Sequence, residues 1–557
     1  MNTQEIFNHR DRLSLSEFDK YDYVLTAILS VAFILFTAVY FDFTIDDVYI
    51  TLRFSKHLAG GHGLVWNIGG PPTEGYTSFL WVIIGSIPHL FSIPADAFVK
   101  FFSILMGLGS IIGVYYYART WQTNQIAAFI AAGYMAFNPA FAAIVVSGME
   151  TALGTFLVFL SAVFLIETIS EYRRRYVIGL YVVLFLAMLT RPGLVVFAAT
   201  TLFVLATVLY QRDRVKQALH LTKYGIGLAF LPGVVYMIWR VAYFGYIFPL
   251  PFTVKSSGSL FVIRGMWYVF EFTTVVVGPL IVVSLIYFIK KSDISFESQI
   301  EPLLPVIVGT IVYMVLFFFI KPWQGDLWRF QMPVIAVITL TSGFIIDNVI
   351  NAKFTDIQYR RVFVIIFVLF LLLIPLHTAA DVRLSQNKRT VEDRVATGKA
   401  LSGVSGEDLN MVVTESGAIP YYSKWNSIDT IGLSNNRVAH NGFDREMLEE
   451  SDPELIQVLV HSHLKNPVHK KSPVIGEYVE NSKYRIAAVT IKQETNFRGQ
   501  YHMFLVDSKD PKYEEISCKL LTINNTEYKD RSIFEYLSNG DIQTSSITQQ
   551  KCLEETV

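Results

Sequence analysis

Long runs of apolar residues, separated by short polar loops, fill the first two thirds of the chain. Each run is long enough to cross the roughly 30 Å hydrocarbon core of a bilayer as a helix. The runs predict about eleven membrane-spanning helices, at 23–40, 97–117, 124–140, 151–168, 177–190, 192–210, 222–242, 266–289, 301–320, 331–349 and 361–378. A further run, at 76–92, is shorter, contains Pro88 and follows a Gly-Pro stretch.

The positions of Lys and Arg decide whether 76–92 crosses the membrane. Short cytoplasmic loops collect basic residues, whereas translocated loops do not. If the N-terminus is inside and 76–92 does not cross, every predicted cytoplasmic loop is basic, with Arg119 and the clusters within 173–175, 212–223, 290–291 and 353–361. Segment 76–92 is therefore predicted to be a re-entrant or interfacial helix. The same topology places the chain after residue 380 outside the cytoplasm.

The hydrophobic pattern changes after residue 380. The whole chain is 52% hydrophobic and 17% charged, and about half of its charged residues lie in 381–557. YRIAAVTI and QYHMFLVD predict strands, MVVTES and GAIPYY a buried strand and a turn, and SDPELIQVLVHSHL a helix. We therefore predict two domains, a transmembrane domain at 1–380 and an extracytoplasmic α/β domain at 381–557. A net charge of −1 argues against a nucleic-acid partner.

Two further features concern the ends of the chain. The first apolar run follows Arg10, Arg12 and Lys20 and lacks a small-residue cleavage site, so we interpret it as a retained span. Cys518 and Cys552, the only cysteines, both lie in the tail. An oxidising compartment could pair them, and two unpaired thiols are an equally good interpretation.

Five polar loops are predicted on the extracytoplasmic face, at 41–76, 147–151, 189–193, 239–255 and 321–330. Ionisable residues at membrane depth are energetically costly and usually line a cavity. We therefore expect these loops to converge on one site. The loops contain no Cys/His cluster typical of zinc, but their Asp and Glu oxygens could hold a hard divalent cation such as Mg²⁺, Ca²⁺ or Mn²⁺.

The first loop carries an acidic pair near the start of a predicted helix at 44–57. Asp46 and Asp47 are adjacent, so on a helix they point about 100° apart and do not share a proton. Thr44 precedes Asp47 by three residues, which has the form of a capping box. Arg53 lies two turns from Asp46 on the same face, as a catalytic carboxylate beside an anionic leaving group would require. A solvated interfacial helix explains the same spacing equally well.

The other charged residues also have structural interpretations. Ser147 with Glu150 again has the form of a capping box. Cations at helix boundaries are often snorkelling anchors; here they are Arg191, Arg240, Lys255 and Arg329. Taken together with aromatic residues on the same face, they suit a cavity for a phosphate and a sugar; the aromatic residues are Tyr76, Tyr243, Tyr246 and Trp328.

The motifs in these loops resemble the C-type (GT-C) glycosyltransferase superfamily, in particular the branch of the mycobacterial terminal β-(1→2) arabinofuranosyltransferases. The aminoarabinose transferases of lipid A and the protein mannosyltransferases are more distantly similar. The motifs are DDVYI at 46–50, RF at 53–54, GHGLVWN at 61–67, EGYTSFLW at 74–81 and SGMET at 147–151, with SGAIPYY at 416–422 and IDTIGL at 428–433 in the tail.

This resemblance implies an all-α GT-C-like bundle with interfacial helices in the first loop, in a bacterial inner membrane. It implies inverting transfer of a sugar, such as a pentofuranose, from polyprenyl phosphate to an envelope glycan, lipid or protein. Asp46 would be the general base, beside Asp47. The donor phosphate would be bound by Arg53, Lys255, Arg329 and Arg240. The sugar or acceptor would be bound by Glu74, Tyr76, Glu150, Arg191, Tyr246, Asp326 and Trp328.

Two other functions remain open at this point. A transporter that flips lipid-linked sugars also needs a polar cavity, although the internal repeats typical of many transporters are not seen in the sequence. A membrane-anchored binding protein would place its function in the C-terminal domain and would make the acids of the first loop dispensable.

Overall fold

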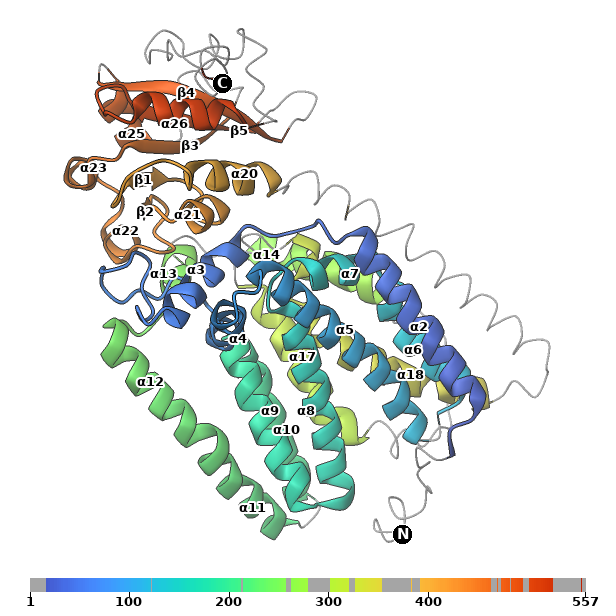
Figure 1. Cartoon of the computed structure of the whole chain (residues 1–557). Coiled ribbons are helices and arrows are strands. Elements are labelled where there is room, and N and C mark those ends of the chain that lie inside the picture. The colour runs from blue at the N-terminus through green and yellow to red at the C-terminus, as the bar shows by residue number, and fades with distance from the viewer. Residues whose placement is uncertain are drawn as a thin grey trace.

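The computed structural model describes residues 17–121, 123–211, 214–256, 262–278, 301–319, 326–352, 382, 391–461, 468, 472–480, 482–493, 500–523 and 552. Figure 1 shows a bundle of helices with a smaller domain, built on a sheet, at one end of it. The tail therefore contains the sheet that the α/β pattern predicted. The predicted spans 361–378 and part of 266–289 lie outside the described residues.

The helices of the bundle follow the apolar runs. Within the described residues, five are long and apolar enough to cross a membrane, and a sixth is possible by joining two helices bent by 53°. The five are α2 (Lys20–Val39), α5 (Ala95–Thr120), α8 (Thr151–Glu171), α10 (Leu194–Gln211) and the continuous helix of α11, η2 and α12 (Val215–Gly225, Ile226–Phe230 and Leu231–Phe244). The bent pair is α6 (Gln125–Ala136) and α7 (Pro139–Val146).

Three shorter helices coincide with further predicted runs. They are α9 (Arg174–Thr190), α17 (Leu304–Leu316) and α18 (Ile335–Ala352). The run at 76–92 forms α4 (Phe79–Leu90), twelve residues long. At 1.5 Å per residue α4 extends about 18 Å, which is too short to cross a bilayer.

Small residues bring the central helices together. All eight residues of α7 are buried, and Gly107 and Gly113 on α5 pack against the rings of Phe33 and Phe159. Close approach of small residues is a main source of helix association in lipid. Large apolar side chains such as Leu35 and Val235 instead stay exposed on the outer helices, as expected for a surface that contacts lipid.

The first loop contains a short helix, α3 (Asp47–Ala59), which agrees with the helix predicted at 44–57. The predicted capping box is wrong, because the hydroxyl of Thr44 donates to the carbonyl of Asp42 at 3.3 Å and does not cap α3. The capping box predicted at Glu150 is also wrong. Glu150 precedes α8 without making a side-chain cap, and its carboxylate pairs with Arg191 at 2.8 Å.

The C-terminal domain has a five-stranded mixed sheet in the order β2-β1-β3-β5-β4. Strands β1, β2 and β3 run parallel, and β5 is antiparallel to both β3 and β4. The strands are β1 (Asn410–Val413), β2 (Asn426–Asp429), β3 (Leu455–His461), β4 (Tyr484–Gln493) and β5 (Gln500–Asp507). One face is covered by α23 (Arg445–Ser451) and α25 (Pro473–Val479), the other by α20 (Glu392–Leu401), α21 (Ala418–Ser423) and α26 (Tyr513–Leu521).

The segment SDPELIQVLVHSHL, predicted as a helix, forms β3 instead. This strand pairs with neighbours on both sides, and Leu455, Ile456 and Val458 are buried. A central strand buried on both faces carries a continuous apolar run, and periodicity alone does not separate such a run from a buried helix. The GAIPYY segment, predicted as a turn, forms most of α21.

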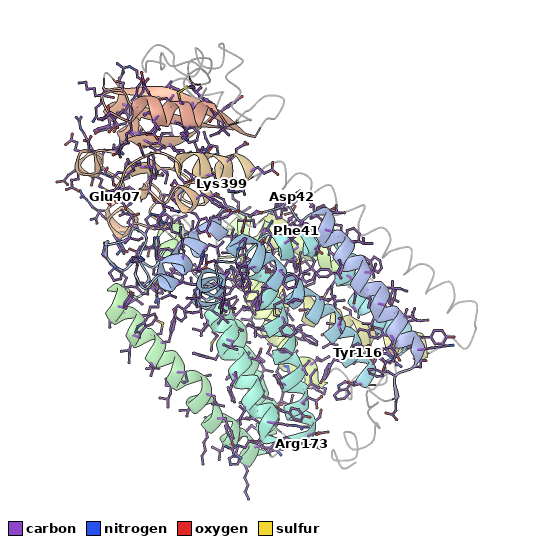
Figure 2. All side chains as sticks on the ribbon, viewed as in Figure 1. Phe41, Asp42, Tyr116, Arg173, Lys399 and Glu407 are labelled. Carbon is purple, nitrogen blue, oxygen red and sulfur yellow. A yellow bond between two sulfur atoms is a disulfide. The ribbon has the colours of Figure 1, made fainter. Side chains whose placement is uncertain are left out.

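The two ends of the bundle differ in their side chains. Figure 2 shows Arg173 at the end remote from the C-terminal domain, and Phe41 and Asp42 at the end next to it, below Lys399 and Glu407. The first loop and the C-terminal domain therefore lie on the same side of the bundle.

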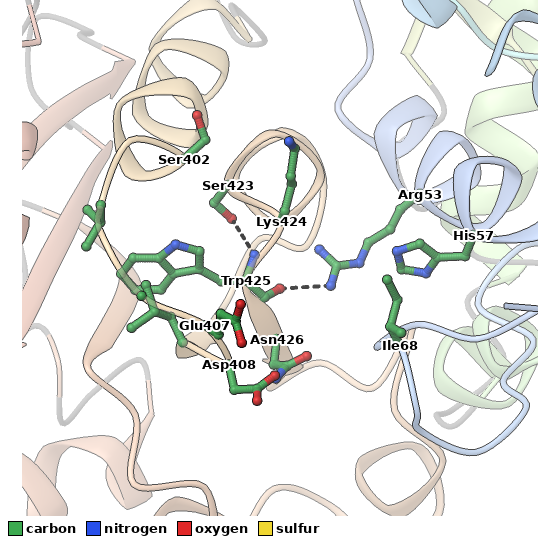
Figure 3. A pocket seen from close by; sticks show the side chains of 13 residues that line it. Arg53, His57, Ile68, Ser402, Glu407, Asp408, Ser423, Lys424, Trp425 and Asn426 are labelled. Carbon is green, nitrogen blue, oxygen red and sulfur yellow. Dashed lines mark hydrogen bonds between the residues drawn. The ribbon is translucent and has the colours of Figure 1, made fainter. Parts of the chain in front are cut away.

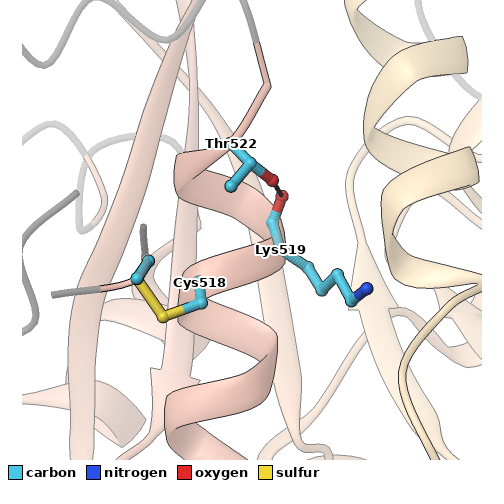
Figure 4. The surroundings of a disulfide bond; sticks show 4 residues. Cys518, Lys519 and Thr522 are labelled. Atoms are coloured by element: carbon cyan, nitrogen blue, oxygen red, sulfur yellow. Dashed lines mark hydrogen bonds between the residues drawn. A yellow bond between two sulfur atoms is a disulfide. The ribbon is translucent and has the colours of Figure 1, made fainter. Parts of the chain in front are cut away.

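Cys518 on α26 and Cys552 form a disulfide (Figure 4). We expect both sulfurs to resist maleimide until a reductant is added, because the reactive species is the thiolate. Cys518→Ser should leave Cys552 labelled without reductant and should destabilise the C-terminal domain by about 2–4 kcal/mol. The mass of the labelled, denatured protein measures both states. Labelling of both cysteines in the unreduced wild-type chain would contradict the bond.

Candidate functional site

The N-terminal end of α3 is held by the segment that precedes α8. The backbone N–H of Ile45 donates to the carbonyl of Ser147 at 3.1 Å, and the indole of Trp81 donates to the carbonyl of Gly148 at 3.0 Å. Gly148 has φ +84° and packs directly against Val48. A residue with a side chain would be strained and crowded there, so SGMET serves to position α3.

Asp46 lies against the C-terminal domain. One carboxylate oxygen accepts the backbone N–H of Ala418 at 3.0 Å, and the other lies 3.4 Å from the guanidinium of Arg394. Gly417 leaves the space that the carboxylate occupies, because a Cβ at that position would coincide with it. Burial raises the pKa of Asp46, Arg394 opposes that rise, and Glu415 and Asp47 add to it.

Asp47 faces the other way, toward the loop before α18. Its carboxylate lies 3.5 Å from Nη2 of Arg329. The Arg329 side chain is 4% exposed, and its Nε and Nη1 have no hydrogen-bond partner among the described residues. An unpaired buried donor carries a desolvation penalty, and more so on a charged group. Arg329 is therefore a site where an anion would be stabilised.

Backbone strain accompanies this arginine. Leu327 and Trp328, immediately before it, have φ of 51° and 54°, in the left-handed region that favours glycine. Such conformations cost about 1–3 kcal/mol each and persist where the surrounding structure imposes them. Trp328 is buried at this turn. Asp326 begins the same turn, but its side chain lies outside the described residues.

Arg191 supports the turn from below. It pairs with Glu150 at 2.8 Å, and it donates to the hydroxyl of Thr151 at 2.6 Å and to the carbonyl of Arg329 at 2.7 Å. The hydroxyl of Tyr313 donates to the carbonyl of Phe330 at 2.6 Å. The sequence predicted that five polar loops converge on one site. Of these, the loops at 147–151 and 189–193 and the described part of the loop at 321–330 meet beside α3.

Arg53 contacts neutral acceptors in this structure, and its role as a phosphate ligand stays a prediction. Its guanidinium donates to the carbonyls of Trp66, Trp425 and Pro420 and to the side chain of Asn67. Burial lowers the pKa of Arg53 to about 9. These neutral acceptors belong to the first loop and to the region around α21, so in this structure Arg53 holds the two domains together.

Neighbouring residues of the first loop extend this contact. The indole of Trp66 donates to Ser427 of β2, at 2.9 Å to its hydroxyl and 3.1 Å to its carbonyl. Asn67 exchanges two hydrogen bonds with the backbone of Ser427, at 3.0 and 3.1 Å. The tail motifs and the first-loop motifs that carry the family resemblance are thus partners in one interface.

Glu74 and Arg240 form a second buried pair. The Nε of Arg240 donates to both carboxylate oxygens at 2.7 Å, and its Nη2 lies 2.6 Å from one of them. The backbone N–H of Leu250 donates to the carbonyl of Glu74 at 3.1 Å. The ion pair and the bond from Leu250 join α12 and the segment after it to the first loop. Burial raises the pKa of Glu74 despite the arginine.

The remaining predicted residues surround this contact. Tyr76 is buried. Its ring makes edge-to-face contacts with the rings of Phe54 and Phe244. Tyr246 stacks on His440 of α22 (Asn436–Asn441) with ring centroids 4.3 Å apart. Lys255 is half-buried on α13 (Leu250–Ser256), which packs against α22.

A cavity of about 420 Å³ lies between the first loop and the C-terminal domain. Figure 3 shows Arg53 and His57 on one side of it, facing Lys424, Glu407 and Asp408 across it. Burial lowers the pKa of His57 to about 4, so its ring is neutral at physiological pH. The volume suits a small polar ligand. Asp46 and Asp47 are not among the residues that line it.

Sequence reasoning missed Arg394, Glu415 and Gly417. No local pattern marks them, since each acts through a partner more than 340 positions earlier or through a neighbour in the tail; the resemblance of 416–422 to the family was the one signal nearby. Among the residues that the structure describes, no group of three or more His, Cys, Asp or Glu is arranged to hold a metal ion.

Two family models match the chain. The model described as dolichyl-phosphate-mannose-protein mannosyltransferase matches residues 81–239, and a domain of unknown function (DUF8728) matches residues 382–514. No curated protein sequence matches.

Solved structures extend the comparison over most of the chain. ArnT from Cupriavidus metallidurans bound to undecaprenyl phosphate is 13% identical, with a TM-score of 0.55 over 86% of this chain and 98% of that chain. The same protein in the apo state is 12% identical, with a TM-score of 0.52 over 86% and 97%. The oligosaccharyltransferase AglB from Archaeoglobus fulgidus is 12% identical, with a TM-score of 0.47 over 79% and 69%. The chain therefore has the fold of ArnT.

Arg53→Lys tests whether Arg53 holds the domains together or binds a ligand. An ammonium group cannot reach carbonyls arranged around a planar guanidinium, and a buried carbonyl left unpaired costs about 1–3 kcal/mol. We expect the midpoint of thermal unfolding to fall without added ligand, whereas Arg437→Lys, at a partly exposed ion cluster of the C-terminal domain, should leave it unchanged. An unchanged midpoint together with weaker donor binding would restore the phosphate role predicted from the sequence.

Proposed function

We propose that this protein is a membrane glycosyltransferase that moves a sugar from a polyprenyl-phosphate donor to an acceptor of the cell envelope. The mannosyltransferase family match and the ArnT fold support a lipid-linked donor. The observation that carries the proposal is the meeting of Asp46 and Asp47 with two buried arginines at one end of the bundle. A pentofuranose donor, in line with the arabinofuranosyltransferase resemblance, is the finer part of the proposal.

Arg329 is the proposed phosphate ligand. Its Nε and Nη1 have no hydrogen-bond partner among the described residues, and Nη2 faces Asp47. A phosphate that takes the place of Asp47 would meet Nη2 together with Nε or Nη1, and either pair of N–H groups matches two phosphate oxygens. Without a donor, Asp47 supplies part of the balancing charge at 3.5 Å. Donor phosphate would replace Asp47 at the guanidinium. Lys255, on α13, is proposed to add positive charge to the same phosphate.

Asp46 is the proposed general base. Burial raises its pKa, which makes the carboxylate a stronger base toward a hydroxyl proton. In a single displacement, Asp46 takes the proton of the acceptor hydroxyl while that oxygen forms a bond to the anomeric carbon. The bond from that carbon to the phosphate oxygen breaks, and its electron pair leaves with polyprenyl phosphate. Attack opposite the leaving group inverts the configuration.

The buried pairs beside these groups are proposed to shape the sugar site. Glu74 is oriented by Arg240, and Arg191 with Glu150 fixes the strained turn that presents Arg329 and Trp328. Tyr76, Tyr246 and the side chain of Asp326 are proposed to complete the contacts to sugar or acceptor, since aromatic faces and carboxylates suit sugar rings and hydroxyls.

We also propose that the C-terminal domain faces the extracytoplasmic side of a bacterial inner membrane. The disulfide between Cys518 and Cys552 favours an oxidising compartment. The basic residues near Arg173 lie at the opposite end of the bundle, as expected for a cytoplasmic end.

Asp46→Asn should lower the rate of sugar transfer by about 10²–10⁴-fold, because the amide cannot accept the acceptor proton. The assay uses purified protein, a radiolabelled polyprenyl-phosphate pentose and an envelope glycan extract, with and without EDTA to reveal a divalent cation. Asp42→Asn, an exposed acid in the same loop, is the matched control. Undiminished transfer by a folded Asp46→Asn protein would remove Asp46 as the base, and wild-type flipping of the donor without transfer would favour a transporter.

Arg329→Lys should raise the KM for the donor by at least about tenfold, which is the change that about 1.4 kcal/mol of lost binding produces. Lysine keeps the charge but loses the planar fork for two oxygens. Arg175→Lys, exposed at the other end of the bundle, controls for loss of a guanidinium. Donor KM values within twofold of each other in the two variants would refute the phosphate role of Arg329.

A further inference from the structure

The C-terminal domain supplies the groups that surround Asp46 from its side of the interface. Arg394 comes from α20, and Gly417 and Ala418 come from the start of α21. The backbone N–H and the guanidinium engage different carboxylate oxygens, at 3.0 and 3.4 Å. Two contacts to the two oxygens fix the plane of the carboxylate, which one contact alone would leave free to rotate.

Arg394 is itself held by a chain of buried polar groups. Its Nη1 lies 3.1 Å from Oε2 of Glu415, and the same oxygen lies 3.3 Å from Nε2 of His502 on β5. The other ring nitrogen of His502 lies 2.7 Å from the side-chain nitrogen of Gln457 on β3. The chain therefore runs from the first-loop carboxylate into the centre of the sheet.

The hydrogen-bond pattern assigns the direction of this chain. The side-chain oxygen of Gln457 accepts the backbone N–H groups of Thr414 and Glu415, at 3.1 and 3.3 Å. Its amide nitrogen therefore faces His502 and donates to Nδ1. That leaves the proton of a neutral His502 on Nε2, where it donates to Glu415. Every hydrogen bond between Gln457 and Arg394 can thus form with His502 neutral.

We propose that Arg394 is a positioning residue for Asp46, and that the chain Gln457–His502–Glu415–Arg394 makes the C-terminal domain part of the catalytic centre. This inference rests on the proposed function, since it concerns the base of that reaction. It assigns a role to the region matched by the domain of unknown function, residues 382–514.

Docking of the two domains does not require this chain. Arg53, Trp66 and Asn67 already join the first loop to the region around α21 and β2. A buried charged pair is a poor way to add stability, because desolvation of the ions offsets most of their attraction. Orientation and charge of Asp46 are what Arg394 adds beyond docking.

The charged and titratable groups that face Asp46 determine in which direction its pKa moves when Arg394 is lost. Arg394 favours the ionised carboxylate, whereas Glu415 and Asp47 disfavour it, and Tyr49 lies nearby on α3. Loss of Arg394 leaves two acids and no cation among these neighbours. Asp46 should then stay protonated to higher pH, and the acid limb of the rate profile should move in the alkaline direction.

Arg394→Gln tests the positioning role in the full-length protein in detergent. We expect kcat to fall at least about tenfold with the donor KM unchanged, and the acid limb of kcat against pH to shift upward. Arg394→Lys should restore the position of the limb, because it restores the cation. Arg437→Gln, in the same domain at a partly exposed ion cluster, should match the wild type. An unshifted limb in Arg394→Gln would overturn the proposal.

A second measurement does not need activity. Thermal unfolding midpoints of Asp46→Asn, Arg394→Gln and the double variant form a cycle. Coupling between the two positions is expected, and additive shifts would overturn the contact.

Gly417→Ala, whose Cβ would coincide with the Asp46 carboxylate, should lower kcat, whereas Gly403→Ala has room for its Cβ and should not. If the cycle shows coupling but the wild-type protein transfers no sugar, the proposed function and the positioning role are both overturned. The contact between Arg394 and Asp46 still holds in that case.

Discussion

A charge largely removed from water must be matched where it lies, and the start of α3 carries two such charges side by side, 13% and 15% exposed. Removing an ion from water costs several kcal/mol unless an opposite charge and hydrogen bonds replace the solvent. Asp46 and Asp47 point in different directions, so a single cation does not serve both. One is matched by Arg394 from the C-terminal domain and the other by Arg329 from the membrane bundle. Adjacent acids on one helix thereby bring two separate parts of the chain to the same place.

The sequence predicted those parts of the structure that depend on local pattern. Apolar runs located the helices of the bundle, and the helix of the first loop was placed to within three residues. The expectation that polar loops converge also holds for Glu150, Arg191 and Arg329, which meet beside α3. That expectation came from topology. The basic loops were assigned to one end of the bundle, which placed the remaining polar loops together at the other end.

Local pattern failed where a distant partner decided the outcome. Thr44 and Ser147 each have the spacing of a helix cap, yet the neighbouring acids pair with arginines from other elements. Residues 455–461 read as a helix until the strands on both sides of them are known. Arg53 and Asp46 share a helix face as predicted. The carbonyl that accepts from Arg53 and the N–H that donates to Asp46 nevertheless belong to residues about 370 positions later, which no local periodicity reports.

The interface between the first loop and α21 also has a consequence for biosynthesis. Arg53 and Pro420 are 367 residues apart in the chain. At about 5–20 residues per second, the ribosome needs roughly 20–70 s to reach the second after making the first. During that interval α3 has been made, but its partners from the C-terminal domain have not. Arg53 lacks the carbonyls of Pro420 and Trp425, and Asp46 lacks the guanidinium of Arg394. Under the proposed mechanism, a newly inserted bundle therefore lacks the groups that orient Asp46 until the C-terminal domain has been synthesised.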